Sequence, residues 1–295
     1  MQSHSSLGLL LGPSGETVAG IEASDPITDE YACQLADAIA ALRRYAQQQS
    51  FSLVTRNYAT YRETFDREST AFFATGGAVH GEPSELMFDL MASVVNWLMA
   101  FRLFLDHTET DLKRRFGRES LEVLRFSEAT SAEYDTQFSY RLMYRMRNYA
   151  QHAGMPSHSM NFRGALVPGP DGSEYTQQTF SFCFDRDGLL RNFKGWGRQV
   201  KGELSQQAKT LEVDPHVTRA MEALNRIMGV VAEVEMPTLL TSARMVGDAI
   251  DRLDLSQGGQ PAIFQFTLDG DVTRNVTIQT IPLRLLALVQ SLIPE

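Results

Sequence analysis

The feature that most constrains this fold is a long apolar stretch over residues 86 to 105, LMFDLMASVVNWLMAFRLFL. Its length suits a membrane span. However, Asp89, Asn96 and Arg102 interrupt it, and each of these side chains is costly in lipid. The stretch therefore predicts a buried helix, extending from about residue 84 to residue 116, and no membrane contact.

Most of the remaining chain also carries helical patterns. Asp25 and Pro26 form a helix start, after which apolar residues repeat every three to four positions. A Ser or Thr cap at position 130 or 131 starts another helix, which Gly154 and Pro156 end. Helices are thus predicted from about residue 25, over 53–73, 84–116, 118–129 and 130–153, and within 195–214, 216–235 and 238–253.

Strands are predicted in two places. Residues 176–193 alternate in polarity around Asp187-Gly188, as a β-hairpin does, after a loop over 157–175. A second hairpin turns at Asp269-Gly270 and precedes a short helix near the C-terminus. The predicted fold is mainly α: a flexible segment over 1–24, a helical bundle with an inserted β-hairpin over 25–235, and a small α/β extension over 236–295.

Composition excludes several function classes. A net charge of −9 argues against broad attraction to nucleic acid or anionic membranes, so any polyanion site has to be local. Cys33 and Cys183 are too few for a disulfide framework or a zinc site and are expected to be small buried hydrophobes in a reducing compartment. Common phosphate-loop, serine-hydrolase and zinc-protease motifs do not occur. We expect no metal, no cofactor and a cytoplasmic location.

One basic island stands out in this acidic chain. No Asp or Glu occurs between Asp135 and Asp171. Helical spacing places four polar residues of this island in one stripe, with Arg147 at its flank. A helix that buries one side and presents such a stripe on the other is suited to binding phosphate. The stripe consists of Arg141, Arg145, Asn148 and His152, and the island also contains Arg163 and His158.

These residue types suit cleavage of the RNA backbone without a metal. The ribose 2′-hydroxyl is an internal nucleophile, so the protein has only to move protons and neutralise charge on the phosphate. A histidine can act as base or acid near neutral pH, and an arginine fork can hold two phosphate oxygens. His152 and Arg147 are the candidates, and Asn148 can orient either side chain.

The segment RNYAQH, residues 147–152, resembles the R-x(4–6)-H signature of the HEPN superfamily, in which Asn, Asp or His typically follows the arginine. RLFLDH, residues 102–107, fits the same spacing, but Leu103 occupies the polar position. The flanking segments also resemble bacterial HEPN-type proteins. The resemblance covers residues 25–235. It implies a helical bundle whose dimerisation joins two motifs into one RNase site, with Arg147 and His152 catalytic and Asn148 supporting.

The same resemblance suggests an endoribonuclease in a toxin or phage-defence system, in which Arg141, Arg145, Arg163 and His158 bind RNA phosphates. Some HEPN toxins carry a regulatory tyrosine two residues after the histidine, where this chain has Gly154. Control by oligomerisation, the C-terminal strands or a regulatory protein partner is expected instead. Two alternatives stay open: a non-catalytic HEPN-like module that binds RNA, a nucleotide or an acidic protein segment, and a purely structural dimer.

Overall fold

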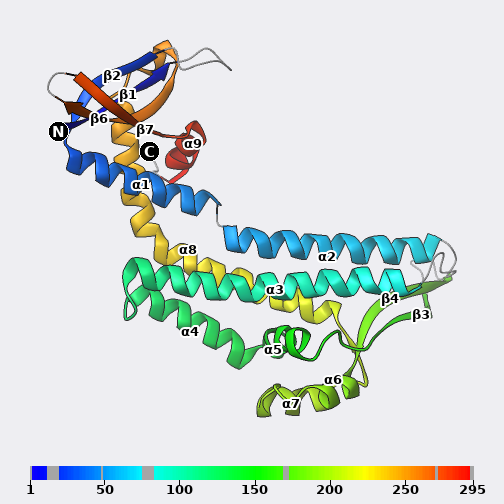
Figure 1. The fold of residues 1–295 in the computed structure, drawn as a ribbon. Coiled ribbons are helices and arrows are strands. Elements are labelled where there is room, and N and C mark those ends of the chain that lie inside the picture. The colour runs from blue at the N-terminus through cyan, green and yellow to red at the C-terminus, as the bar shows by residue number, and fades with distance from the viewer. Residues whose placement is uncertain are drawn as a thin grey trace. The chain divides into compact units, whose positions relative to one another are not determined.

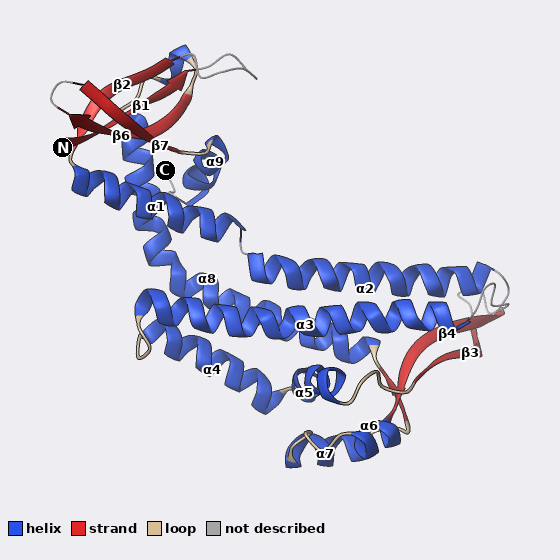
Figure 2. Ribbon diagram, in the orientation of Figure 1, coloured by secondary structure: helices blue, strands red, loops and turns tan. Residues whose placement is uncertain are grey.

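The computed structural model describes residues 2–11, 20–47, 49–74, 83–168, 173–269 and 272–292. The chain is mainly helical and has two small antiparallel sheets, as Figures 1 and 2 show, which confirms the coarse fold class. Two compact units make up the chain. One is Ser50–Glu233, and the other combines Met1–Gln49 with Val234–Glu295.

The unit Ser50–Glu233 is built around the predicted long helix, α3. Its aromatic residues Trp97, Phe101 and Phe104 are almost fully buried. By length and composition Met87–Phe116 could cross a membrane, but 56% of its most apolar window is buried inside the protein. The prediction of a buried helix is confirmed. The helices of this unit are α2 Gln49–Ala74, α3 Pro83–Phe116, α4 Leu121–Thr136, α5 Phe138–His152, α6 Arg186–Asn192, α7 Arg198–Ser205 and the first part of α8 Asp214–Asp251.

The helix predicted over 130–153 is wrong at its start. Ser120 caps α4 by accepting a hydrogen bond from the Val123 amide (3.3 Å), and α4 runs on to Thr136. Gln137 then adopts extended backbone (φ −112°, ψ 105°) and separates α4 from α5. Neither proline nor glycine marks this break, so the helical pattern runs through it. Tyr134 therefore belongs to α4, and Arg147 and His152 belong to a separate helix, α5.

The sheet of this unit has the order β3-β4-β5, and its register corrects two predictions. Residues 158–168, which were expected to lie in a loop, form a strand. This strand pairs with the strand that follows it, and His158 lies opposite Phe184. Asp187-Gly188 is not a hairpin turn, because the Asp185 carboxylate accepts hydrogen bonds from both amides and so caps α6. The strands are β3 His158–Pro168, β4 Glu174–Asp185 and β5 Thr210–Glu212.

The second unit combines both ends of the chain. Residues 2–11 and 20–24, predicted to be flexible, lie in strands of a sheet with the order β2-β1-β6-β7, in which Leu7 pairs with Ile263. Both side chains belong to the buried core. Local patterns cannot reveal a partner this distant in sequence. The elements are β1 Gln2–Leu11, β2 Gly20–Ile27, α1 Asp29–Gln47, the 3₁₀ turn η1 Leu255–Gln257, β6 Gln260–Asp269, β7 Val272–Thr280 and α9 Leu283–Leu292.

The C-terminal part follows its prediction except at one proline. The second hairpin and the short terminal helix are confirmed, while Gly270 at its turn lies outside the described residues. The two helices predicted on either side of Pro237 are one continuous helix, α8. The unit boundary at 233/234 lies close to the predicted one, but α1 packs in the core of the second unit and not in the bundle.

Candidate functional site

Arg147 lines a cavity of about 460 Å³ formed by α2, α3 and α5. Its side chain is half-buried. The Nη1 group donates a hydrogen bond to Asn148 Oδ1 (3.3 Å), as expected if Asn148 orients the arginine. The buried Nε makes no hydrogen bond to any residue that the structure describes. A half-buried guanidinium that lines an open cavity is suited to binding an anion.

The lining of this Arg147 cavity is polar on one side. Asn57 from α2 and Asn96 and Arg102 from α3 contribute amide and guanidinium groups. Asp106 also lines it, but its carboxylate is paired with Arg102 (Nη2 to Oδ1, 2.8 Å). The remaining positive charge is that of Arg147. The cavity therefore favours a negatively charged ligand.

His152 lies apart from this cavity. It is the last residue of α5, exposed to solvent, and it does not line the cavity. The Ala153 amide closes the helix on the Tyr149 carbonyl (2.8 Å), and Gly154 follows with φ 91°, so the predicted helix end is confirmed. Two residues five positions apart on an α-helix point in directions that differ by about 140° around its axis. One copy of the chain thus presents Arg147 and His152 in different directions.

Arg141 does not have the predicted role in phosphate binding. The residue is 3% exposed. Its guanidinium binds both carboxylate oxygens of Glu203 on α7 (Nε to Oε2, 3.2 Å; Nη2 to Oε1, 2.6 Å) and donates to the Tyr134 carbonyl on α4. Because its donors hold three helices together beneath the surface, it is not available to RNA. The predicted stripe is wrong at this position.

The other predicted phosphate-binding residues are not gathered at the Arg147 cavity either. Arg145 Nε and Nη2 donate to the Tyr134 hydroxyl (3.2 and 3.1 Å). His158 Nδ1 bonds the Pro156 carbonyl (2.7 Å). Neither of these side chains lines that cavity. Arg163 lies in β3 opposite Thr179, but its side chain is outside the described part of the structure.

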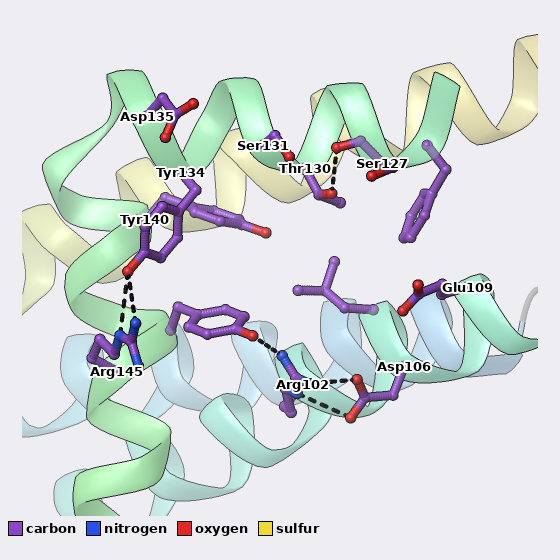
Figure 3. Close-up of a pocket in the computed structure, with 13 residues that line it drawn as sticks. Arg102, Asp106, Glu109, Ser127, Thr130, Ser131, Tyr134, Asp135, Tyr140 and Arg145 are labelled. Atoms are coloured by element: carbon purple, nitrogen blue, oxygen red, sulfur yellow. Dashed lines mark hydrogen bonds and ion pairs between the residues drawn. The ribbon is translucent and has the colours of Figure 1, made fainter. Parts of the chain in front are cut away.

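A second cavity, of about 410 Å³, lies between α3, α4 and α5 (Figure 3). Arg102 and Asp106 line both cavities, so their ion pair forms a shared wall. Arg102 also donates to the Tyr144 hydroxyl and lies 4.9 Å from the centre of that ring. Arg102 was not chosen as the motif arginine because Leu103 follows it, although it is a charged residue in the most apolar helix. A costly charge inside such a helix was the signal that could have identified it.

Ser139 and His216 form a pair that resembles a catalytic dyad. Ser139 Oγ and His216 Nδ1 are 2.8 Å apart, and Phe138 packs edge-on against the imidazole. The residues are 4% and 8% exposed, and neither lines either cavity. Buried in this way, the pair connects the first turn of α5 to the first turn of α8, and substrate cannot reach it.

This pair makes stability depend on pH. Burial, together with the positive charge of Arg219, lowers the pKa of His216 from 6.5 to about 4. Below pH 6.5 the unfolded chain binds a proton that the folded chain excludes, so stability falls as the pH drops from 6.5 towards 4. We expect His216 to lower the free energy of unfolding by about 2 kcal/mol between pH 7 and pH 5. Urea titrations of wild type and His216→Gln at both pH values should differ by this amount; equal pH dependence would contradict it.

The described residues include no group of three or more His, Cys, Asp or Glu side chains placed to hold a metal ion. Cys183 is buried, as predicted, but Cys33 is exposed. Comparison of the chain with protein-family models, with curated proteins and with solved structures finds no match. The resemblance to the HEPN superfamily therefore depends on the residues of the motif and its flanks.

Proposed function

We propose that this chain is a metal-independent endoribonuclease of HEPN type whose site is completed by a second copy. One observation carries the proposal. The motif arginine lines an open cavity that also contains amide groups, is held by the adjacent Asn148, and keeps a buried donor, Nε, without a partner among the described residues. A phosphodiester oxygen is an acceptor of the right charge for the Arg147 guanidinium.

The reaction needs two proton transfers and one charge to be neutralised. A base removes the proton of the ribose 2′-hydroxyl, whose oxygen attacks the adjacent phosphorus, and the 5′-oxygen leaves with a proton from an acid. The products are a 2′,3′-cyclic phosphate and a 5′-hydroxyl. His152 supplies the imidazole, and Arg147 stabilises the charge that develops on the phosphate oxygens.

The proposed reaction requires a homodimer. Arg147 lines the cavity while His152 is exposed at the end of the same helix and outside it. In a twofold dimer, each surface meets its own equivalent, so the end of one α5 can approach the cavity of the other copy. Such a pairing gives two equivalent sites, each with Arg147 of one copy and His152 of the other, and this one imidazole acts first as base and then as acid. The role in toxin or phage-defence systems and the cytoplasmic location belong to the same proposal.

The decisive experiment is RNA cleavage in EDTA. Purified protein is expected to cut single-stranded RNA in excess chelator and to leave 2′,3′-cyclic phosphate ends, detected by mass spectrometry. DNA of the same sequence should stay intact, because it has no 2′-hydroxyl. RNA that stays intact over a range of protein concentrations, including those at which the protein is dimeric, would contradict the proposal.

A second candidate function has an observation in its favour. Since the Arg147 cavity of one copy contains no histidine, it can bind a phosphate ester without cutting it. This binding-module hypothesis predicts that RNA or nucleotide binds the protein and is recovered unchanged. The same incubation, analysed by filter binding as well as by product mapping, separates the two functions.

A further inference from the structure

The second cavity contains polar groups that the fold does not use. The Asp135 carboxylate and the Ser131 hydroxyl make no hydrogen bond or ion pair with any described residue, although both line the cavity. By contrast, Glu109 is paired with Lys113 (2.5 Å) and Asp106 with Arg102. Figure 3 shows the α4 residues on one side of the cavity and Arg102, Asp106 and Glu109 on the other. The Asp135 and Ser131 side chains are both exposed to solvent and accessible to a ligand.

The walls of the cavity are aromatic. Tyr134 from α4 and Tyr140 and Tyr144 from α5 line it. The Tyr134 and Tyr144 rings meet edge to face (centres 5.7 Å apart), and the Tyr140 and Tyr144 rings are nearly parallel (6.5 Å). Tyr140 is 2% exposed and Arg102 lies over the Tyr144 ring, so the half-buried Tyr134 ring is the surface on which a nucleobase can stack, as unpaired RNA bases do on aromatic side chains.

Arg145 supplies donors at the end of the cavity. Its Nε and Nη2 are bonded to the Tyr134 hydroxyl, but its Nη1 makes no hydrogen bond to a described residue. The unused groups are thus a guanidinium donor and, on α4, a carboxylate acceptor. Their charges are opposite, so the site favours a neutral ligand that has both donors and acceptors over a bare phosphate.

Guanine matches this combination better than the other bases. Its N1–H and N2–H₂ groups are adjacent donors for a carboxylate, and its O6 and N7 atoms are adjacent acceptors for an arginine. Adenine lacks the oxygen acceptor, and the pyrimidines lack N7. A volume of about 410 Å³ lies in the range of small-molecule sites.

We infer that the second cavity binds an unpaired guanine of the RNA substrate. The base stacks on the Tyr134 ring, Asp135 accepts hydrogen bonds from its N1–H and N2–H₂ groups, and Arg145 donates to its O6 or N7 atom. This inference rests on the proposed function for its substrate class. The shared Arg102–Asp106 wall places the base site next to the Arg147 cavity, where the adjoining phosphate binds.

Binding of the four nucleoside 3′-monophosphates to the intact protein tests the inference without requiring cleavage. Isothermal titration should show guanosine 3′-monophosphate binding at least about tenfold more tightly than the adenosine, cytidine and uridine compounds. Asp135→Asn should reduce this preference about tenfold, because the amide repels one of the two base donors. Glu128→Gln, an exposed charge change on the same helix that does not line the cavity, is the matched control and should leave the preference unchanged.

Failure of the inference and failure of the nuclease proposal give different results. RNA cleavage at all four bases, with equal binding of the four nucleotides, overturns the guanine site and leaves the nuclease. Selective binding of the guanosine compound that Asp135→Asn removes supports the guanine site even if no RNA is cut. A preference that survives Asp135→Asn but is lost in Glu128→Gln overturns the inference, because the recognition would then lie elsewhere on α4.

Discussion

Arg147→Ala and His152→Ala are each expected to lower the rate of RNA cleavage by at least about 100-fold, because each removes either phosphate stabilisation or proton transfer. Neither change should unfold the protein. Within the described part of the chain, Arg147 makes one hydrogen bond, to its neighbour Asn148, and His152 is exposed at a helix end. First-order rates on a short RNA, measured with the thermal midpoint of each variant, check both statements.

Two matched controls are available in the same unit. His107, in the rival RLFLDH segment, is exposed and lines neither cavity, and Arg118 is exposed in the turn before α4. His107→Ala and Arg118→Ala should keep wild-type rates. A loss of activity in His107→Ala equal to that in His152→Ala would contradict the assignment of the motif.

Mixing the two inactive variants tests whether the site combines two copies. If Arg147 of one copy acts with His152 of another, random exchange gives half heterodimers, each with one intact pair, and restores about a quarter of the wild-type activity. A site contained in one chain would stay inactive in the mixture. Size-exclusion chromatography with light scattering confirms that exchange has occurred.

Helices were predictable from this sequence where buried apolar residues recur at helical spacing. The stretch around Trp97 specified α3 to within one residue at its start, and the final apolar run specified α9. The break at Gln137 and the continuity of α8 through Pro237 were not predictable, because packing decided against the local signals in both cases. The N-terminal strand was not predicted for a different reason. Its residue Leu7 pairs with Ile263, more than 250 residues away, and no short-range pattern encodes that pairing.

The candidate site could likewise be predicted from the sequence only in part. Periodicity placed Arg147 on α5 and ended that helix near His152, but it could not distinguish a solvated arginine from a buried one. Arg141 has the same residue type and lies on the same helix, and only the position of Glu203 on α7 shows that its charge is neutralised inside the protein. The cavities themselves arise from the crossing of three helices, which a one-dimensional pattern does not contain.

The Arg141–Glu203 pair is expected to give the largest loss of stability. The arginine side chain is 4% exposed and the carboxylate 30% exposed, so removing the carboxylate leaves the more deeply buried charge unpaired. Glu203→Ala should therefore lower the free energy of unfolding by about 3–5 kcal/mol. Arg141→Met should cost less, because methionine fills much of the space and Glu203 can still be hydrated.

The double variant separates this ion pair from ordinary packing. Once Arg141 is methionine, Glu203→Ala has no buried charge to expose, so Arg141→Met/Glu203→Ala should be more stable than Glu203→Ala alone. Urea unfolding of the four proteins gives the coupling energy directly. Additive losses would mean that the Arg141 guanidinium does not interact with Glu203 in solution. Arg141 would then have spare donors, and its predicted role in phosphate binding would have to be reconsidered.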